Sequence, residues 1–163
     1  MILRNHVEWA LHCCSVLAQH EADIFIPTKD LAQFHGVPKE YLSKALQALA
    51  KADIIEGTLG PHGGYRLKKS PEKISFLDIV EAINGRQNTF QCTSIINNNP
   101  CLKKNEKSPG ICDVAQVMYE ADEAWRGRLR AFTLAELTAQ LKTKVGPEQL
   151  QKNSNWFLDR QNT

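Results

Sequence analysis

The sequence predicts a mainly α-helical fold with a small β-hairpin wing: a winged helix-turn-helix domain followed by a long helix. Two observations predict the first part. Apolar-periodic segments at residues 29–35 and 38–52 are separated only by the helix-breaking Gly36-Val37-Pro38, which is typical of a helix-turn-helix pair. A glycine-rich turn at residues 57–64 follows directly between two short strand-like runs, which is typical of a wing.

Length and composition indicate an ordinary globular protein. The chain has 163 residues, 42% of them hydrophobic, and a formal net charge of +2, so any nucleic-acid surface must be a local cluster of basic residues. No apolar run approaches the roughly 18–20 residues of a membrane span, and the polar N-terminus argues against a secretory signal. We therefore expect a cytoplasmic protein, without a membrane partner, whose five cysteines are reduced.

The first elements follow from apolar spacing. Residues 5–20 are expected to form a helix, and Ile24–Ile26 a short strand. Thr28 is expected to cap helix 29–35. The inner face of helix 38–52 carries Leu42, Ala45, Leu46 and Leu49.

The hairpin and the next helix have equally clear signals. A strand begins at Ile54, the turn spans 57–64, and the chain returns through residues 65–67. Ser75 followed by Asp78 predicts a capped helix over 76–84.

The second half divides into a loop, two helices and a tail. Residues 86–110 are polar and form a long loop, helix 112–131 follows, and Thr133 with Glu136 caps another helix. The polar end is expected to be flexible. The expected segments are a winged helix-turn-helix domain at 1–85, a loop at 86–111, two helices at 112–145, and a flexible tail at 146–163.

The outer face of helix 38–52 is the expected DNA-reading surface. Lys44 and Gln47 share that face and could read base edges. The full expected set adds phosphate and wing contacts: Thr28, Lys39, Tyr41, Ser43, His62 and Arg66. A solvated polar face is the simpler reading of the helix alone, and the adjacent wing favours DNA.

The cysteines suggest metal or redox chemistry. Cys92, Cys101 and Cys112 lie nine and eleven residues apart, which is not the spacing of a zinc ribbon. Three cysteines are one ligand short of an ordinary iron–sulfur site. Cys13 and Cys14 are candidates for the fourth, but Cys14 lies on the apolar stripe of its helix.

Glu8 and His12 form a further candidate pair. They lie one helical turn apart, away from the apolar stripe, and could supply half of a metal site. Taken alone, they are more simply explained as a surface pair.

The wing and the recognition helix carry a family resemblance. The stretches Val37-Pro38-Lys39-Glu40-Tyr41-Leu42 and Gly57-Thr58-Leu59-Gly60-Pro61-His62-Gly63-Gly64-Tyr65, with loop cysteines before a long helix, resemble the winged-helix iron–sulfur regulators that include IscR, NsrR and RsrR. The resemblance covers roughly residues 1–140. It implies that residues 1–85 are a DNA-binding domain, residues 86–111 a cluster-binding loop, and residues 112–145 the dimerisation helix and the helix that follows it. The protein is then a homodimer formed through the long helix. This dimer binds operator DNA and holds a cluster between one subunit's loop and the other's first helix.

Within that family the chain looks closest to RsrR. The resemblance implies a 2Fe–2S cluster held by Cys92 and Cys112 of one subunit and by Glu8 and His12 of the other, with Cys101 spare. Reduction would release His12 or Glu8 and shift the dimer interface, and the oxidised form would bind DNA more tightly. At Leu59 many members have a basic residue, so DNA affinity is expected to depend on the helix.

Three other functions were weighed. The runner-up is a thiol switch of the same fold, without a cluster, in which Cys101 pairs with Cys92 or Cys112. The second alternative is a structural zinc site, in which the protein would contain bound metal but would be colourless and would not undergo a redox cycle. A cysteine-nucleophile enzyme assisted by His12 has no oxyanion-hole motif, so we expect no enzyme.

Overall fold

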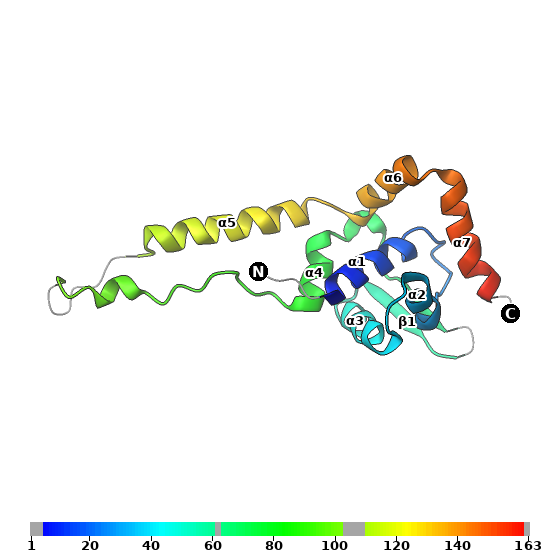
Figure 1. Cartoon of the computed structure of the whole chain (residues 1–163), viewed down its shortest axis with the longest axis horizontal. Helices are drawn as coiled ribbons and strands as arrows, with labels where there is room; N and C mark the ends of the chain where they lie inside the picture. Colours follow the sequence, from blue (N-terminus) through cyan, green and yellow to red (C-terminus); the bar gives the residue numbers. More distant parts are fainter. Residues whose placement is uncertain (1–4, 61–62, 103–109, 162–163) are drawn as a thin grey trace.

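The computed structural model describes residues 5–60, 63–102 and 110–161. A helical body carries a projecting arm (Figure 1). The elements in chain order are α1 (Asn5–Leu17), α2 (Thr28–His35), α3 (Lys39–Lys51), β1 (Ile55–Thr58), β2 (Gly64–Leu67), η1 (Pro71–Lys73), α4 (Phe76–Asn84), η2 (Ile95–Asn98), α5 (Asp113–Arg130), α6 (Leu134–Val145) and α7 (Pro147–Gln161).

Helix α1 lies at the centre of the body. It packs against α3 and α4, and its Ala10, Cys13 and Cys14 are fully buried. Leu46 of α3 and Ile79 of α4 belong to the same apolar core. Burial of this shared core holds α1 against α3, the helix that the sequence predicts to contact DNA.

The helix-turn-helix and the wing form as expected. Gly36 ends α2 with a left-handed φ of 63°, and α3 begins after Pro38. Strands β1 and β2 pair antiparallel, and Ile26 exchanges two backbone hydrogen bonds of 2.9 Å with Tyr65 of β2. A Cβ on Gly64 would lie 2.4 Å from the Ile26 carbonyl, so only glycine allows this close approach.

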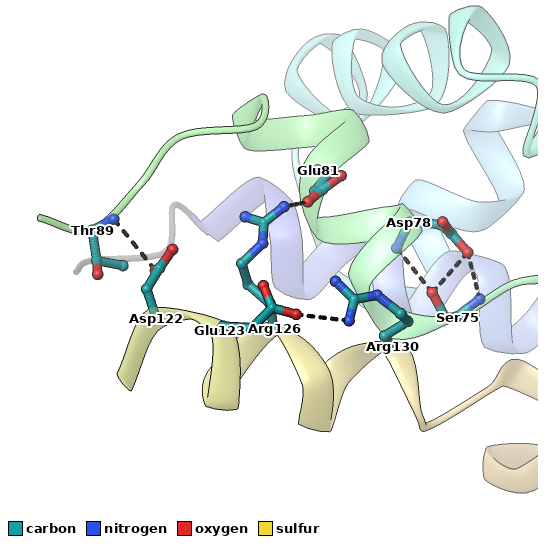
Figure 2. A network of polar contacts seen from close by, with 8 residues as sticks. All are labelled: Ser75, Asp78, Glu81, Thr89, Asp122, Glu123, Arg126 and Arg130. Atoms are coloured by element: carbon teal, nitrogen blue, oxygen red, sulfur yellow. Dashed lines mark hydrogen bonds and ion pairs between the residues drawn. The ribbon is translucent and has the colours of Figure 1, made fainter. Parts of the chain in front are cut away.

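The arm consists of α5 and the loop before it, which run side by side away from the body (Figure 1). The Thr89 amide donates to Asp122 Oδ1 at 3.3 Å, and the Phe90 and Tyr119 rings lie 5.8 Å apart. Where α5 meets the body, Arg126 pairs with Glu81 of α4 (Figure 2). The Arg126 side chain is only 7% exposed, so this ion pair is a buried joint.

Several expected boundaries are corrected by the structure. Helix α1 ends at Leu17, because residues 18–20 form a turn. Thr28 is the first helical residue and makes no capping bond; Pro27 occupies the cap position. Ile24–Ile26 contributes one bridge, not a strand. Both capping boxes, at Ser75 and Thr133, are confirmed.

The chain end also differs from its expectation. Residues Pro147–Gln161 form helix α7 where the sequence predicts a flexible tail. Phe157 of α7 is 1% exposed and packs on Phe34 of α2, with ring centroids 4.8 Å apart. Gln161 donates to the Phe25 carbonyl at 3.0 Å. Contacts with distant parts of the chain therefore hold a helix whose own composition is polar.

Among the described residues, none of the helices combines the length and apolar character that crossing a bilayer requires.

Candidate functional site

The exposed face of α3 presents the expected DNA-reading residues together. Lys39, Lys44 and Gln47 are exposed, and Tyr41 is 52% exposed. The Lys44 ammonium lies 5.7 Å from the centre of the Tyr41 ring. Ser43 is half-buried, and its hydroxyl donates to the Lys39 carbonyl at 2.9 Å. The face therefore offers two cations, an amide and a phenol to a groove.

The other expected DNA contacts lie in different surroundings. Thr28 is half-buried at the start of α2, and His62 lies outside the described residues. Arg66 donates from Nε to Glu56 at 2.7 Å and from Nη1 to the Ala22 carbonyl at 2.9 Å. Its guanidinium also lies over the Phe25 ring, so Arg66 braces the base of the wing.

His6 is a neighbour of this face that sequence reasoning missed. Its ring stacks on Tyr41 with centroids 6.0 Å apart, and it lies 5.2 Å from the Trp9 ring. Because His6 belongs to α1 and Tyr41 to α3, this contact links the first helix directly to the recognition helix. Their wide separation in the sequence gave no local signal of it.

Cys92 and Cys112 line one small pocket of about 240 Å³ on the arm, together with Ser94 and Tyr119. Both cysteines are half-buried, and the Ser94 amide donates to Cys92 Sγ at 3.4 Å. Cys101 is exposed outside the lining of this pocket. The structure thus brings together the two cysteines that the resemblance pairs and leaves the third apart.

Cys13 and Cys14 have a different environment. Both are fully buried in the core around α1. Burial raises the pKa of Cys13 to about 12, and it raises the pKa of Cys14 as well. A thiol that resists ionisation and packs in the core is a poor metal ligand, which leaves Cys92 and Cys112 as the better donors.

Glu8 and His12 are both exposed on α1, while Val7, Ala10 and Cys14 of the same helix are buried. The His12 ring lies 5.8 Å from that of His35. Burial, and secondarily the nearby His12, lowers the pKa of His35 below its ordinary value. The predicted orientation of the pair away from the core is confirmed.

One chain does not bring all four candidate ligands together. Helix α1 lies in the body, whereas the start of α5, which Cys112 precedes, lies at the outer end of the arm (Figure 1). Within the described ranges of a single chain, no group of three or more His, Cys, Asp or Glu side chains suits a metal ion.

Helix α5 carries an apolar face open to solvent. Val114, Val117 and Met118 are 68%, 63% and 38% exposed, and Ile111 just before the helix is 65% exposed. Large exposed apolar patches mark association surfaces in soluble proteins.

Comparison with known families decides the classification. Residues 3–140 match the Rrf2 family, described as iron-dependent transcriptional regulators. The chain belongs to the Rrf2 family. This Rrf2-family protein is a DNA-binding transcription regulator with a winged helix, and it is not an enzyme.

Individual relatives agree with this classification. The Rrf2-family chain is 34% identical over 121 residues to protein rrf2 of Nitratidesulfovibrio vulgaris, covering 74% of this chain and 76% of the relative. It is 28% identical over 137 residues to the transcriptional regulator NsrR of Bacillus licheniformis. This match covers 84% of this chain and 92% of NsrR. The solved structure of CymR, the global cysteine regulator of Bacillus subtilis, has the same fold as this chain, with a TM-score of 0.67 at 18% sequence identity. The match covers 86% of this chain and 98% of CymR. The expected likeness to IscR- and NsrR-type regulators is thus confirmed, and the particular likeness to RsrR stays a prediction.

Proposed function

We propose that this Rrf2-family regulator binds operator DNA in the cytoplasm as a homodimer and senses redox state through a 2Fe–2S cluster at the dimer interface. The ligands would be Cys92 and Cys112 of one protomer and Glu8 and His12 of its partner. The observation that carries the proposal is the shared pocket of Cys92 and Cys112, set apart from the exposed Glu8 and His12 of the same chain.

The apolar face of α5 supports a dimer. Burying Val114, Val117 and Met118 against a second copy would remove apolar surface from water and stabilise association. Two-fold pairing of a projecting arm also lets the arm of one chain reach the body of the other. The four ligands, split between arm and body, then have a route to a common site.

The donor set fits an iron–sulfur centre with mixed ligands. Two thiolates suit one iron, and a carboxylate with an imidazole suits the other. Such a centre supplies one-electron exchange, and replacing thiolates by nitrogen or oxygen donors raises its potential. Glu8 and His12 are exposed, so neither has to leave a core to serve as a ligand.

The helix that carries Glu8 and His12 is in direct contact with the helix expected to bind DNA. Glu8 and His12 lie on α1, and α1 packs directly against α3. The His6–Tyr41 ring contact lies at the same junction. Any pull on α1 from the partner's arm therefore acts on the helix that presents Lys44 and Gln47. Two packings of this junction would supply the two states that a switch needs.

The test is an absorption spectrum of protein prepared without oxygen. Wild-type protein is expected to be brown, and the double variant Glu8→Ala, His12→Ala colourless or much paler. The double variant Glu72→Ala, Lys152→Ala changes two exposed residues outside α1 and α5; it is the control and should keep the wild-type spectrum. A double variant with the full wild-type spectrum and iron content would contradict the ligand assignment.

A thiol switch is the second candidate, favoured by the common pocket of Cys92 and Cys112. Oxidation by a peroxide, which is reduced to water, would join Cys92 and Cys112 in a disulfide. The sequence expectation had Cys101 as one partner, but Cys101 lies outside the lining of this pocket. Protein of that kind is colourless as prepared, and a diagonal gel would reveal the disulfide after oxidation. The same anaerobic spectrum therefore separates the two functions.

A further inference from the structure

A cavity of about 680 Å³ lies between α1, α2, α6 and α7. Its volume falls within the roughly 300–1,000 Å³ typical of small-molecule sites. The lining from α7 includes Leu150 and Phe157, and α6 contributes Leu141 and Lys142. These residues follow residue 140, where the match to the Rrf2 family ends. The cavity is therefore completed by a part of this chain that the family match does not cover.

Half-buried Phe34 lines the cavity from α2, and Phe157, which is only 1% exposed, packs behind it. Phe34 lies 4.8 Å from Phe157, and His20 meets Phe157 edge-on at 5.4 Å between ring centroids. His35 lies 5.1 Å from Phe34, and Leu150 adds aliphatic surface. Offset and edge-to-face contacts with such rings favour a flat aromatic body in the cavity.

The polar part of the lining is mainly cationic or hydrogen-bonding. Lys142 is exposed and forms no ion pair among the described residues, whereas Lys152 of α7 pairs with Glu148 at 2.8 Å. Glu21 is the acidic group of the lining. An ammonium free of a protein partner at the edge of an apolar cavity favours an anionic group on the ligand.

Two wall imidazoles have incomplete hydrogen bonding. His20 Nδ1 donates to the Val16 carbonyl at 2.9 Å, since a carbonyl can only accept. The Nε2 atoms of His20 and His35 are buried without a partner in the described structure. Unsatisfied buried polar atoms are uncommon in a finished core, and both of these belong to residues of the cavity lining while being covered by neighbouring side chains.

We propose that this cavity binds a small aromatic carboxylate, with its ring system against Phe34 and Leu150 and its carboxylate beside Lys142. His12, a proposed cluster ligand, is also part of the lining, so the tests below change residues other than His12. A ligand there would contact α2, which leads through Gly36 into α3.

Calorimetric titration of the 163-residue protein tests the site with a matched pair of probes. 2-Naphthoate carries the carboxylate, and 2-naphthamide has the same ring system without the charge. Lys142→Gln is expected to weaken 2-naphthoate binding about five- to tenfold and to leave 2-naphthamide binding unchanged. Glu21→Gln should strengthen naphthoate binding or leave it unchanged.

Two further variants keep the outcome decisive. Lys144→Gln, an exposed lysine of α6 outside the lining, should bind both probes as wild type does. Leu150→Trp should narrow the cavity where the ring system would lie and weaken binding of both probes to a similar degree, with an unchanged circular dichroism spectrum. The proposal is overturned if wild-type protein fails to bind 2-naphthoate at millimolar concentration, or if Lys142→Gln and Lys144→Gln weaken it equally. Neither result bears on the cluster, because the titration uses no DNA or iron readout.

Discussion

Burial divides the five cysteines into two chemical classes. Cys13 and Cys14 are buried and their pKa values are raised, so at pH 8 their thiolate fraction is very small. Cys92, Cys101 and Cys112 lie at or near the surface. In metal-free protein, iodoacetamide should alkylate these three within minutes and spare Cys13 and Cys14, as read by peptide mass spectrometry.

Urea provides the control for that labelling pattern. Unfolded protein should label at all five cysteines, which shows that the pattern depends on the fold. Rapid native labelling of Cys13 or Cys14 would contradict their place in the core and reopen them as ligands.

At the residue scale, the exposed face of α3 is the surface that we expect to contact DNA. Gln47→Ala should weaken binding to a selected operator about ten- to a hundredfold while barely changing binding to random DNA, because a base-edge contact carries sequence information. Lys39→Ala should weaken binding to the operator and to random DNA alike. It should also lower the slope of log affinity against log salt concentration by about one. Fluorescence anisotropy over a salt series measures each effect.

Exposed Lys152 on α7 is the matched control for these variants. Lys152→Ala is expected to match wild type on both DNAs. If Gln47→Ala lost equal affinity for operator and random DNA, Gln47 would be a backbone contact and the base-reading assignment would be wrong.

Sequence periodicity was enough to place some site residues and not others. The spacing of Val7, Cys14 and Leu17 correctly predicted that Glu8 and His12 face away from the core. It could not predict that Arg66 braces the wing, because its partners Glu56 and Ala22 come from a neighbouring strand and a distant loop. Side chains that act across elements leave no local pattern.

At the element scale, the joint between α4 and α5 sets the direction of the arm. Arg126→Met would leave Glu81 without its buried partner and should lower the free energy of unfolding by about 2 kcal/mol, less than a fully buried pair because Glu81 is 29% exposed. Arg130→Met breaks the exposed pair with Glu123 and should cost less than about 1 kcal/mol. Urea denaturation measures the free energy of unfolding of each variant. An equal loss in the two variants would contradict the claim that the pair of Arg126 and Glu81 holds α5 to α4.

Helix α7 is attached to the body chiefly through Phe157. Phe157→Ala should lower the free energy of unfolding by about 3 kcal/mol, since it empties the space beside Phe34 and His20. Asn155→Ala, an exposed change on the same helix, should stay within about 0.5 kcal/mol of wild type. Thermal unfolding compares the two, and a silent Phe157→Ala would mean that α7 is not docked.

Element boundaries show where local signals were enough. The capping boxes at Ser75 and Thr133 correctly gave the starts of α4 and α6, because capping is chemistry between residues three apart. Helix α7 was missed because its sequence is mostly polar. What stabilises it is the burial of Phe157 against α1 and α2, which only the folded chain reveals.

At the scale of the whole molecule, the arm and the body separate the candidate ligands. The apolar face of α5 and the side chains of Glu8 and His12 are all exposed in one chain's described structure. In the proposed dimer, the second chain would cover the apolar face and bring thiolates to Glu8 and His12. Sequence patterns identify such faces but do not fix how two copies meet, because that depends on shape complementarity between folded surfaces.

The central claim is that the ligands of one site come from two chains, and mixed dimers test it most directly. One chain carries Cys92→Ser and Cys112→Ser, and the other carries Glu8→Ala and His12→Ala. Each homodimer lacks a complete site. A dimer of one chain of each kind, selected by two affinity tags and reconstituted without oxygen, has one complete site only if ligands are shared. We predict that it regains the visible spectrum with half the iron of wild type, whereas a mixed dimer as colourless as the two homodimers would contradict the account.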